Sequence, residues 1–198
     1  MHADALPVLA ETGCLFVTTA VESVDDEILD RLAKDHTRDD FRRVVEVCRG
    51  AGLVLSPTFV PFTPWTTLAG YCDLLSVIAE LDLVDHVAPV QLAIRLLIPA
   101  GSRLLELAGL RALVEGRFDR EALSYRWANP DPRVDRLAGQ LQQLVWQGEK
   151  AGHSRREIFA RIWAEAHAAA GLSRPAPLPE AAPFQRTSVP YLNEPWYC

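Results

Sequence analysis

Short apolar runs alternate with amphipathic stretches over the first hundred residues. Cys14–Thr19 and Leu53–Phe59 are apolar and β-branched, which is typical of buried parallel strands. Between them, Arg38–Arg49 has apolar residues at positions i, i+3, i+4 and i+7, which predicts a helix with one buried face. Thr37 precedes this stretch and is expected to be its N-cap.

The same patterns predict further elements on either side of these two strands. A third strand is expected at Gln91–Leu97. Helices are expected at Ala5–Ala10, Asp25–Ala33, Thr66–Leu81 and, as a short one, Ser102–Leu107. Because strands and helices alternate, the pattern indicates βαβ units with a parallel sheet.

The pattern changes after about Gly116. Val134–Gln147 and Ser154–Ala169 are expected to form two packing helices with no strand between them. Ser154 and Glu157 have the spacing of a capping box at the start of the second helix. Beyond residue 172 the chain is rich in proline, which favours an extended tail. We therefore expect β/α units over residues 1–116, a helical extension over 117–172 and the extended tail over 173–198.

Composition and charge narrow the class of protein. The chain has 198 residues, a net charge of −6 and 49% hydrophobic residues, which is the balance of a soluble globular protein. The negative charge argues against a general nucleic-acid binder. No apolar run approaches the ~20 residues that span a bilayer, and the N-terminus lacks the pattern of a signal peptide. We expect a cytoplasmic protein that binds neither nucleic acid nor membrane.

The cysteines and histidines show no metal-ligand spacing. The four cysteines, Cys14, Cys48, Cys72 and Cys198, are widely and irregularly spaced. This favours reduced thiols over a disulfide framework, and we expect no metal site built from this chain alone.

Glu22 and Ser23 are the strongest candidates for chemistry on position alone. They follow the first expected strand directly, and functional side chains of parallel α/β barrels gather at that edge. A carboxylate at this place can pair with an ammonium group or accept hydrogen bonds from sugar hydroxyls. Ser23 can support it, or it can serve as the N-cap of the next helix.

The surroundings of these two residues resemble radical S-adenosylmethionine (SAM) enzymes. Those enzymes often carry G(V/I)ES at the end of the fourth strand, followed by a helix, a short linker and a second helix ending in Ala-Gly. This sequence has AVES at Ala20–Ser23, DDEILDRLAKDHT at Asp25–Thr37 and RRVVEVCRGAG at Arg42–Gly52. The resemblance covers about Gly13–Leu81. It implies an α/β fold, a partial (β/α) TIM-like barrel that is the back half of a radical SAM barrel, followed by the helical region and the proline-rich tail.

The resemblance also implies a cofactor and a chemistry. In radical SAM enzymes a CxxxCxxC loop in the front half of the barrel ligates a [4Fe–4S] cluster, which reduces SAM to a 5′-deoxyadenosyl radical. Carried over by match, Glu22 and Ser23 lie near the SAM ribose and amino-acid moiety. An electron donor and a small-molecule or peptide substrate are the implied partners.

Arg95 is a charge inside an apolar run, and buried arginines are rare unless they are paired. In a barrel lumen it could bind the carboxylate of SAM or of a substrate in a bidentate fork. The alternative is a structural ion pair with Glu22 or with an acid of another region.

Two features depart from the family pattern. No three cysteines have the CxxxCxxC spacing, so the [4Fe–4S] cluster requires an upstream half. Val60–Thr66 stands where the family usually has G-x-P-G-x-T, so the loop that faces SAM is unusual.

The last residues carry a second resemblance. Asn193–Cys198 (NEPWYC) is similar to the tail of a group of bacterial radical SAM proteins, which ends in WYC-C-A-E-P or WYC-U-A-E-P, where U is selenocysteine. We expect a truncation at the position of that cysteine or selenocysteine, with Cys198 as part of a redox tail.

Two hypotheses of function follow. In the first, the chain is part of a radical SAM enzyme, inactive alone, with Glu22, Ser23 and Arg95 positioning SAM. In the second, it is a non-catalytic α/β interaction module or a pseudoenzyme that lacks the cluster.

Overall fold

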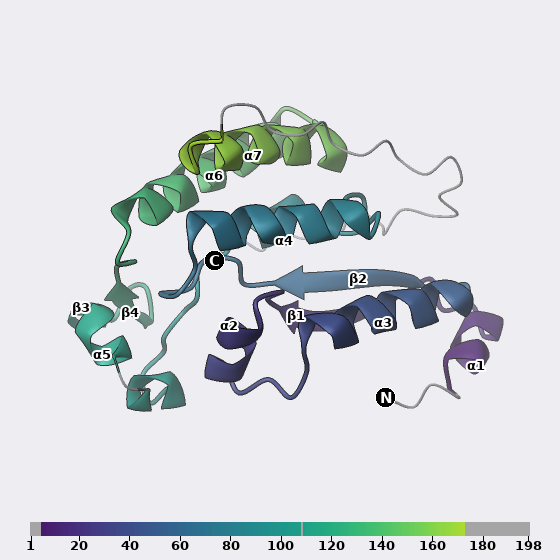
Figure 1. Ribbon diagram of the computed structural model, residues 1–198, viewed down its shortest axis with the longest axis horizontal. Helices are drawn as coiled ribbons and strands as arrows, with labels where there is room; N and C mark the ends of the chain where they lie inside the picture. The colour runs from purple at the N-terminus through teal and green to yellow at the C-terminus, as the bar shows by residue number, and fades with distance from the viewer. Residues whose placement is uncertain (1–4, 108, 173–198) are drawn as a thin grey trace.

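The computed structural model describes residues 5–107 and 109–172 (Figure 1). The proline-rich tail and Cys198 lie outside the described residues, so the redox role of Cys198 stays a prediction. The elements, with 3-10 helices marked η, are α1 (Leu6–Glu11), β1 (Phe16–Glu22), α2 (Asp26–Arg31), α3 (Arg38–Gly50), β2 (Val54–Phe59), α4 (Leu68–Glu80), η2 (Pro89–Leu92), η3 (Arg103–Glu106), α5 (Leu110–Leu113), β3 (Val114–Asp119), β4 (Ser124–Trp127), α6 (Pro132–Lys150) and α7 (Arg155–Ala169).

The expected helix starts at Thr37 and Ser154 are confirmed. Thr37 caps α3 and forms a capping box with Asp40, while Ser154 forms one with Glu157 at the start of α7. Each box satisfies backbone N–H groups that the first turn of a helix leaves without a partner. The two helices therefore begin where the sequence predicts.

The strands β1 and β2 form the expected parallel pair. Their register runs from Phe16 opposite Val54 to Ala20 opposite Thr58, and it shifts between Ala20 and Glu22. Alternate residues of β2, among them Leu55 and Phe59, are buried. The pair therefore turns one face toward the core, as the period of two in a strand requires.

The third strand predicted at Gln91–Leu97 is wrong. Residues 89–92 form the 3-10 helix η2, and only Arg95 makes a parallel bridge, opposite Phe62. The cause is local: the side-chain oxygen of Gln91 accepts the hydrogen bond from the backbone N–H of Phe59 at 3.2 Å. A side chain thus takes the place of the backbone ladder there, and pairing resumes only where Phe62 exchanges hydrogen bonds with Ile94 and Leu96.

The region predicted as a helical extension contains an antiparallel hairpin, β3–β4, before its two helices. β3 (VEGRFD) is polar and largely exposed, so it lacks the alternation that marks a half-buried strand. The hairpin is held by the segment after Arg95, since Tyr125 N–H donates to the carbonyl of Ile98 and Ile98 N–H donates to Ser124 Oγ. Within the described residues the two small sheets do not close a barrel.

The main core lies on both sides of α4. Figure 1 shows α4 between the β1–β2 pair and the layer formed by α6 and α7. Leu75, Val77 and Ile78 on α4 are fully buried. The apolar residues of α6 and α7 belong to the same buried cluster as those of the β/α units. The C-terminal helices thus cover the outer face of α4 and share its core.

No helix in residues 5–107 and 109–172 combines the length and the apolar character that a membrane span needs.

We predict opposite effects for two glycine substitutions in α6. A Cβ at Gly148 would lie 2.8 Å from Cγ1 of Ile158 on α7, so Gly148→Ala should destabilise the protein by about 1–3 kcal/mol through overpacking. Gly139 has open space around it, so Gly139→Ala should stabilise α6 by about 0.5–1 kcal/mol. Urea unfolding measures both, and equal stabilisation by the two variants would contradict the close packing of α6 on α7.

Candidate functional site

Glu22 closes β1 in an unusual backbone conformation. Its φ is +66°, in the left-handed region that few residues other than glycine adopt, and the β1–β2 register shifts at the same point. The carbonyl of Glu22 accepts from Val60 N–H at 2.9 Å, and its carboxylate binds Lys34 Nζ at 2.9 Å. The bent strand end therefore places a paired carboxylate at the carboxyl edge of the sheet.

Ser23 lies at this edge but is not the cap of α2. It is buried, and its hydroxyl accepts from the backbone N–H of Asp25 at 3.1 Å. Asp25 is the N-cap, because its Oδ1 accepts from the N–H groups of Glu27 and Ile28. The alternative of Ser23 as N-cap is wrong, and its hydroxyl instead supports the turn that leads into the helix.

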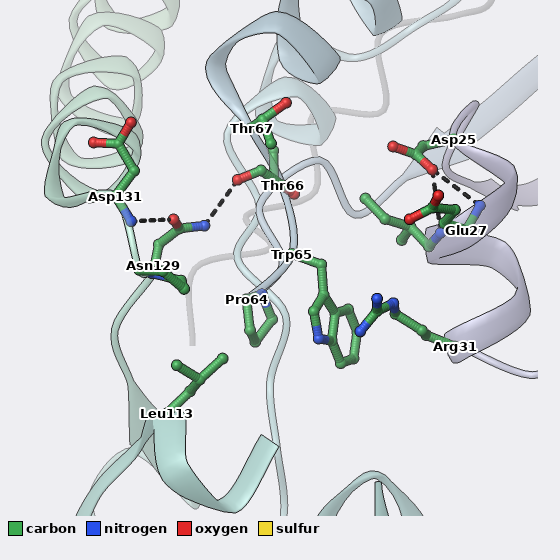
Figure 2. Close-up of a pocket in the computed structure, with 12 residues that line it drawn as sticks. Asp25, Glu27, Arg31, Pro64, Trp65, Thr66, Thr67, Leu113, Asn129 and Asp131 are labelled. Carbon is green, nitrogen blue, oxygen red and sulfur yellow. Dashed lines mark hydrogen bonds between the residues drawn. The ribbon is translucent and has the colours of Figure 1, made fainter. Parts of the chain in front are cut away.

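A cavity of about 320 Å³ lies beyond the ends of β1 and β2. Four parts of the chain line it: α2 with its cap, the loop at residues 64–67 before α4, Leu113 at the end of α5, and residues 129–131 before α6. In Figure 2, Trp65 lies between Leu113 and Arg31, and the side chain of Asn129 points toward Thr66. Ser23 lines a small recess next to it, which shares Thr66 and Thr67 with the cavity. Glu22 does not line the cavity.

Asn129 holds two of these walls together. It is buried, and its Nδ2 donates to the carbonyl oxygens of Thr63 at 3.3 Å and Thr66 at 2.9 Å. Its Oδ1 accepts from the backbone N–H of Asp131 at 2.9 Å (Figure 2). The Nδ2 bonds therefore hold the loop before α4 against the start of α6, and the Oδ1 bond holds the turn that leads into α6.

Arg95 belongs to the same network. Its guanidinium binds Asp135 Oδ1 at 2.7 Å, donates to the carbonyl of Trp127 at 3.1 Å and lies 4.1 Å above the Trp127 ring. The second oxygen of Asp135 accepts from Asn129 N–H. Of the two roles considered for Arg95, ligand binding and a structural ion pair, the structure favours the ion pair, and Asp135 is the acid of another region that forms it. Glu22 is not its partner, since that carboxylate binds Lys34.

Arg31 and Trp65 form the wall of the cavity opposite Asn129. The Arg31 guanidinium lies 5.4 Å from the centre of the Trp65 ring, a cation–π contact (Figure 2). Glu27 stands one turn earlier on α2 and is exposed. Asp131 caps α6, and its hydrogen bonds with Arg133 hold the pKa of this carboxyl below its usual range. The cavity therefore carries charges of both signs.

Sequence reasoning missed Arg31 and Asn129 as cavity residues, and for Trp65 it favoured packing over a place at the mouth of the fold. Their proximity arises from long-range contacts, and Trp65 taken alone is most simply a packing residue. The one available signal was that charged residues follow the strand end on a short helix, at Glu27 and Arg31.

The described cysteines do not fit an iron–sulfur cluster. Cys48 and Cys72 are buried, and burial raises the pKa of both thiols, which disfavours the thiolate that binds iron. Cys14 is half-buried. In the part of the chain that the structure describes, no three histidine, cysteine or acidic side chains gather at a spacing that could hold a metal ion.

The sequence matches no family model. The fold is similar to that of a solved structure described as a cobalamin-dependent S-adenosylmethionine radical enzyme, OxsB, with aqua-cobalamin bound. The TM-score is 0.62 at 12% sequence identity, over 84% of this chain and 30% of that chain. The chain has a radical SAM-like fold. At this identity the likeness concerns the fold alone, and it extends over less than a third of the length of the neighbour.

We predict that the network around Asn129 controls the stability of the cavity walls. Asn129→Ala should cost about 1–3 kcal/mol, because it removes the Nδ2 donor from the Thr66 carbonyl and one of the two donors of the Thr63 carbonyl, which also accepts from Thr66 N–H. Asn129→Asp keeps the shape and the acceptor but loses the donor, so it should destabilise the protein at pH 7 as well. Chemical unfolding measures both variants, and a loss below about 0.5 kcal/mol in each would contradict the role assigned to Asn129.

Proposed function

We propose that this chain forms part of a radical SAM enzyme and binds SAM at the carboxyl edge of β1 and β2. The observation that carries the proposal is the cavity of about 320 Å³ at this edge, in a chain with a radical SAM-like fold. Ligands of parallel α/β folds bind beyond the carboxyl ends of the strands, where the loops leave an open mouth.

The residues at this edge suit the groups that SAM presents. SAM carries ribose hydroxyls, a positive sulfonium and an amino-acid end, and these need acceptors and charges of both signs. Glu22 offers a carboxylate that is one-fifth exposed and held in place by Lys34. Ser23, buried beneath, shapes the adjoining recess. Arg95 contributes by holding Asp135 and, through it, the wall at Asn129.

In this proposal Glu22, which lies at the same strand edge but outside the lining of the cavity, accepts hydrogen bonds from the ribose hydroxyls, while Ser23 keeps the turn after β1 rigid. When bound beside a reduced [4Fe–4S] cluster, SAM supplies a carbon-centred radical for reaction with a substrate. The described cysteines do not hold such a cluster, so its ligands have to come from another part of a longer polypeptide or from another chain. An electron donor and a small-molecule or peptide substrate remain part of the proposal.

Titration calorimetry of the full chain with SAM tests this function. We predict saturable binding and about a tenfold loss of affinity in Glu22→Gln, because one charge-assisted hydrogen bond contributes roughly 1.5 kcal/mol. Glu46→Gln is the matched control, since Glu46 is an exposed acid on α3, away from the strand ends, and should leave binding unchanged.

Absence of saturable binding at millimolar SAM would contradict the proposal and favour the non-catalytic interaction module. Equal losses in Glu22→Gln and Glu46→Gln would show that Glu22 makes no contact with SAM.

A further inference from the structure

The outer face of α6 is exposed and carries no charge over most of its length. Residues 137–148 contain no acidic or basic side chain, although 23% of the residues in the chain are charged. Trp146 stands on this face with 53% of its surface exposed. The other exposed residues of the stretch are Gly139, Gln140, Gln142, Gln143 and Gln147. Because the solvent face of a helix usually carries charged side chains, this face suits an uncharged partner.

The side chains of this face match an extended proline-rich segment. Such a segment has no internal backbone hydrogen bonds, so its carbonyl oxygens can accept hydrogen bonds from a neighbour. Glutamine amides donate to carbonyls, and an exposed aromatic ring packs against proline rings. Gln143 and Gln147 stand on either side of Trp146 along the helix, and both are exposed. The face therefore combines the ring and the donors that recognition of proline-rich segments uses.

The chain itself contains such a segment soon after α7. Residues 175–183 have the sequence PAPLPEAAP, with four prolines and a single charged residue, Glu180. This composition favours an extended backbone and lacks the charges that would conflict with an uncharged surface. The segment and the α6 face therefore have matching chemistry.

The packing of α6 and α7 brings the start of this segment to one end of the face. Helix α7 runs back along α6, with Gly148 packed against Ile158 near the turn that joins them (Figure 1). Leu172, which is half exposed, therefore lies toward the start of α6. At 1.5 Å per helical residue, Trp146 is roughly 20 Å from that start. An extended proline-rich chain advances about 3.1 Å per residue, so about seven residues after Leu172 reach Trp146.

Opposite charges fit the same register. Lys150 stands one turn beyond Trp146, and its Nζ lies 4.9 Å from the centre of the Trp146 ring. Within residues 5–107 and 109–172, Lys150 forms no ion pair. A segment that has Pro179 at Trp146 places Glu180 at the turn that carries Lys150. The one acid of the segment thus meets a base that no described acid engages.

We propose that residues 175–183 of this chain dock on the outer face of α6. Their proline rings pack on Trp146, Gln143 and Gln147 donate to their carbonyls, and Glu180 pairs with Lys150. A segment tethered this close to its site has an effective concentration in the millimolar range, which gives it the advantage over a proline-rich segment of another molecule. The inference does not depend on SAM or on the cavity.

Nitrogen-15 relaxation of the full chain tests the docking. The heteronuclear NOE of a backbone amide reports motion on the picosecond to nanosecond timescale. We expect Leu178 and Ala181 to show the values of rigid backbone in the wild type, and to fall to the values of the isolated tail peptide in Trp146→Ala. Lys150→Glu should lower them as well. Lys150→Glu combined with Glu180→Lys should restore them, because the pair forms again with its charges exchanged.

Two variants on the β3–β4 hairpin are the matched controls. Leu123→Ala removes a comparably exposed apolar side chain, and Arg117→Glu reverses an exposed charge. Both should leave the NOE values of the tail unchanged, and far-UV circular dichroism checks that every variant is folded.

Three results would overturn the proposal. The first is a wild-type tail with the NOE values of the isolated peptide. The second is a rigid tail that Trp146→Ala does not release. The third is a rigid tail that becomes mobile on dilution, which would show that the face holds the tail of a second copy instead.

Discussion

The hydrogen bonds of Asn129 are the constraint on which the candidate site depends. They join the loop over the ends of the parallel strands to the start of α6, across 63 residues of sequence. Asp135 and Arg95 extend this connection to the hairpin, since Arg95 binds both Asp135 and the carbonyl of Trp127. A buried carbonyl without a donor costs free energy of folding. These bonds therefore fix the positions of two cavity walls. The third wall, α2, follows from the bend of the chain at Glu22.

The apolar core positions this hydrogen-bond network but contributes no polar group to it. Helix α4 is buried between the strand pair and the α6–α7 layer, so the N-termini of α4 and α6 are brought to the same end of the molecule. The parallel pairing of β1 and β2 puts both strand ends at that edge. A cavity with polar and charged walls thus forms where apolar packing stops. Two of its charged residues, Glu27 and Arg31, form no ion pair within residues 5–107 and 109–172, and the Arg31 guanidinium lies over the Trp65 ring.

Local patterns were sufficient for much of the fold. Periodicity and capping act over a few residues, and they were enough to predict the strands β1 and β2, the long helices and the caps at Thr37 and Ser154. The third strand failed because the side chain of Gln91 takes the hydrogen bond that a backbone ladder would have made. The hairpin was missed because β3 is a short, polar and exposed strand.

Less of the candidate site could be predicted from the sequence. The strand-end rule predicted that Glu22 and Ser23 lie at the carboxyl end of β1, as they do, but the partners of Glu22 and Arg95 could not be derived, because Lys34 and Asp135 are brought close only by tertiary packing. Hydrogen exchange of the full chain with and without SAM tests the central claim, that this edge is the ligand site. We predict protection of the backbone amides at residues 22–31, 60–67 and 129–131 on binding. Binding without protection there, or with protection confined to α7, would contradict the account.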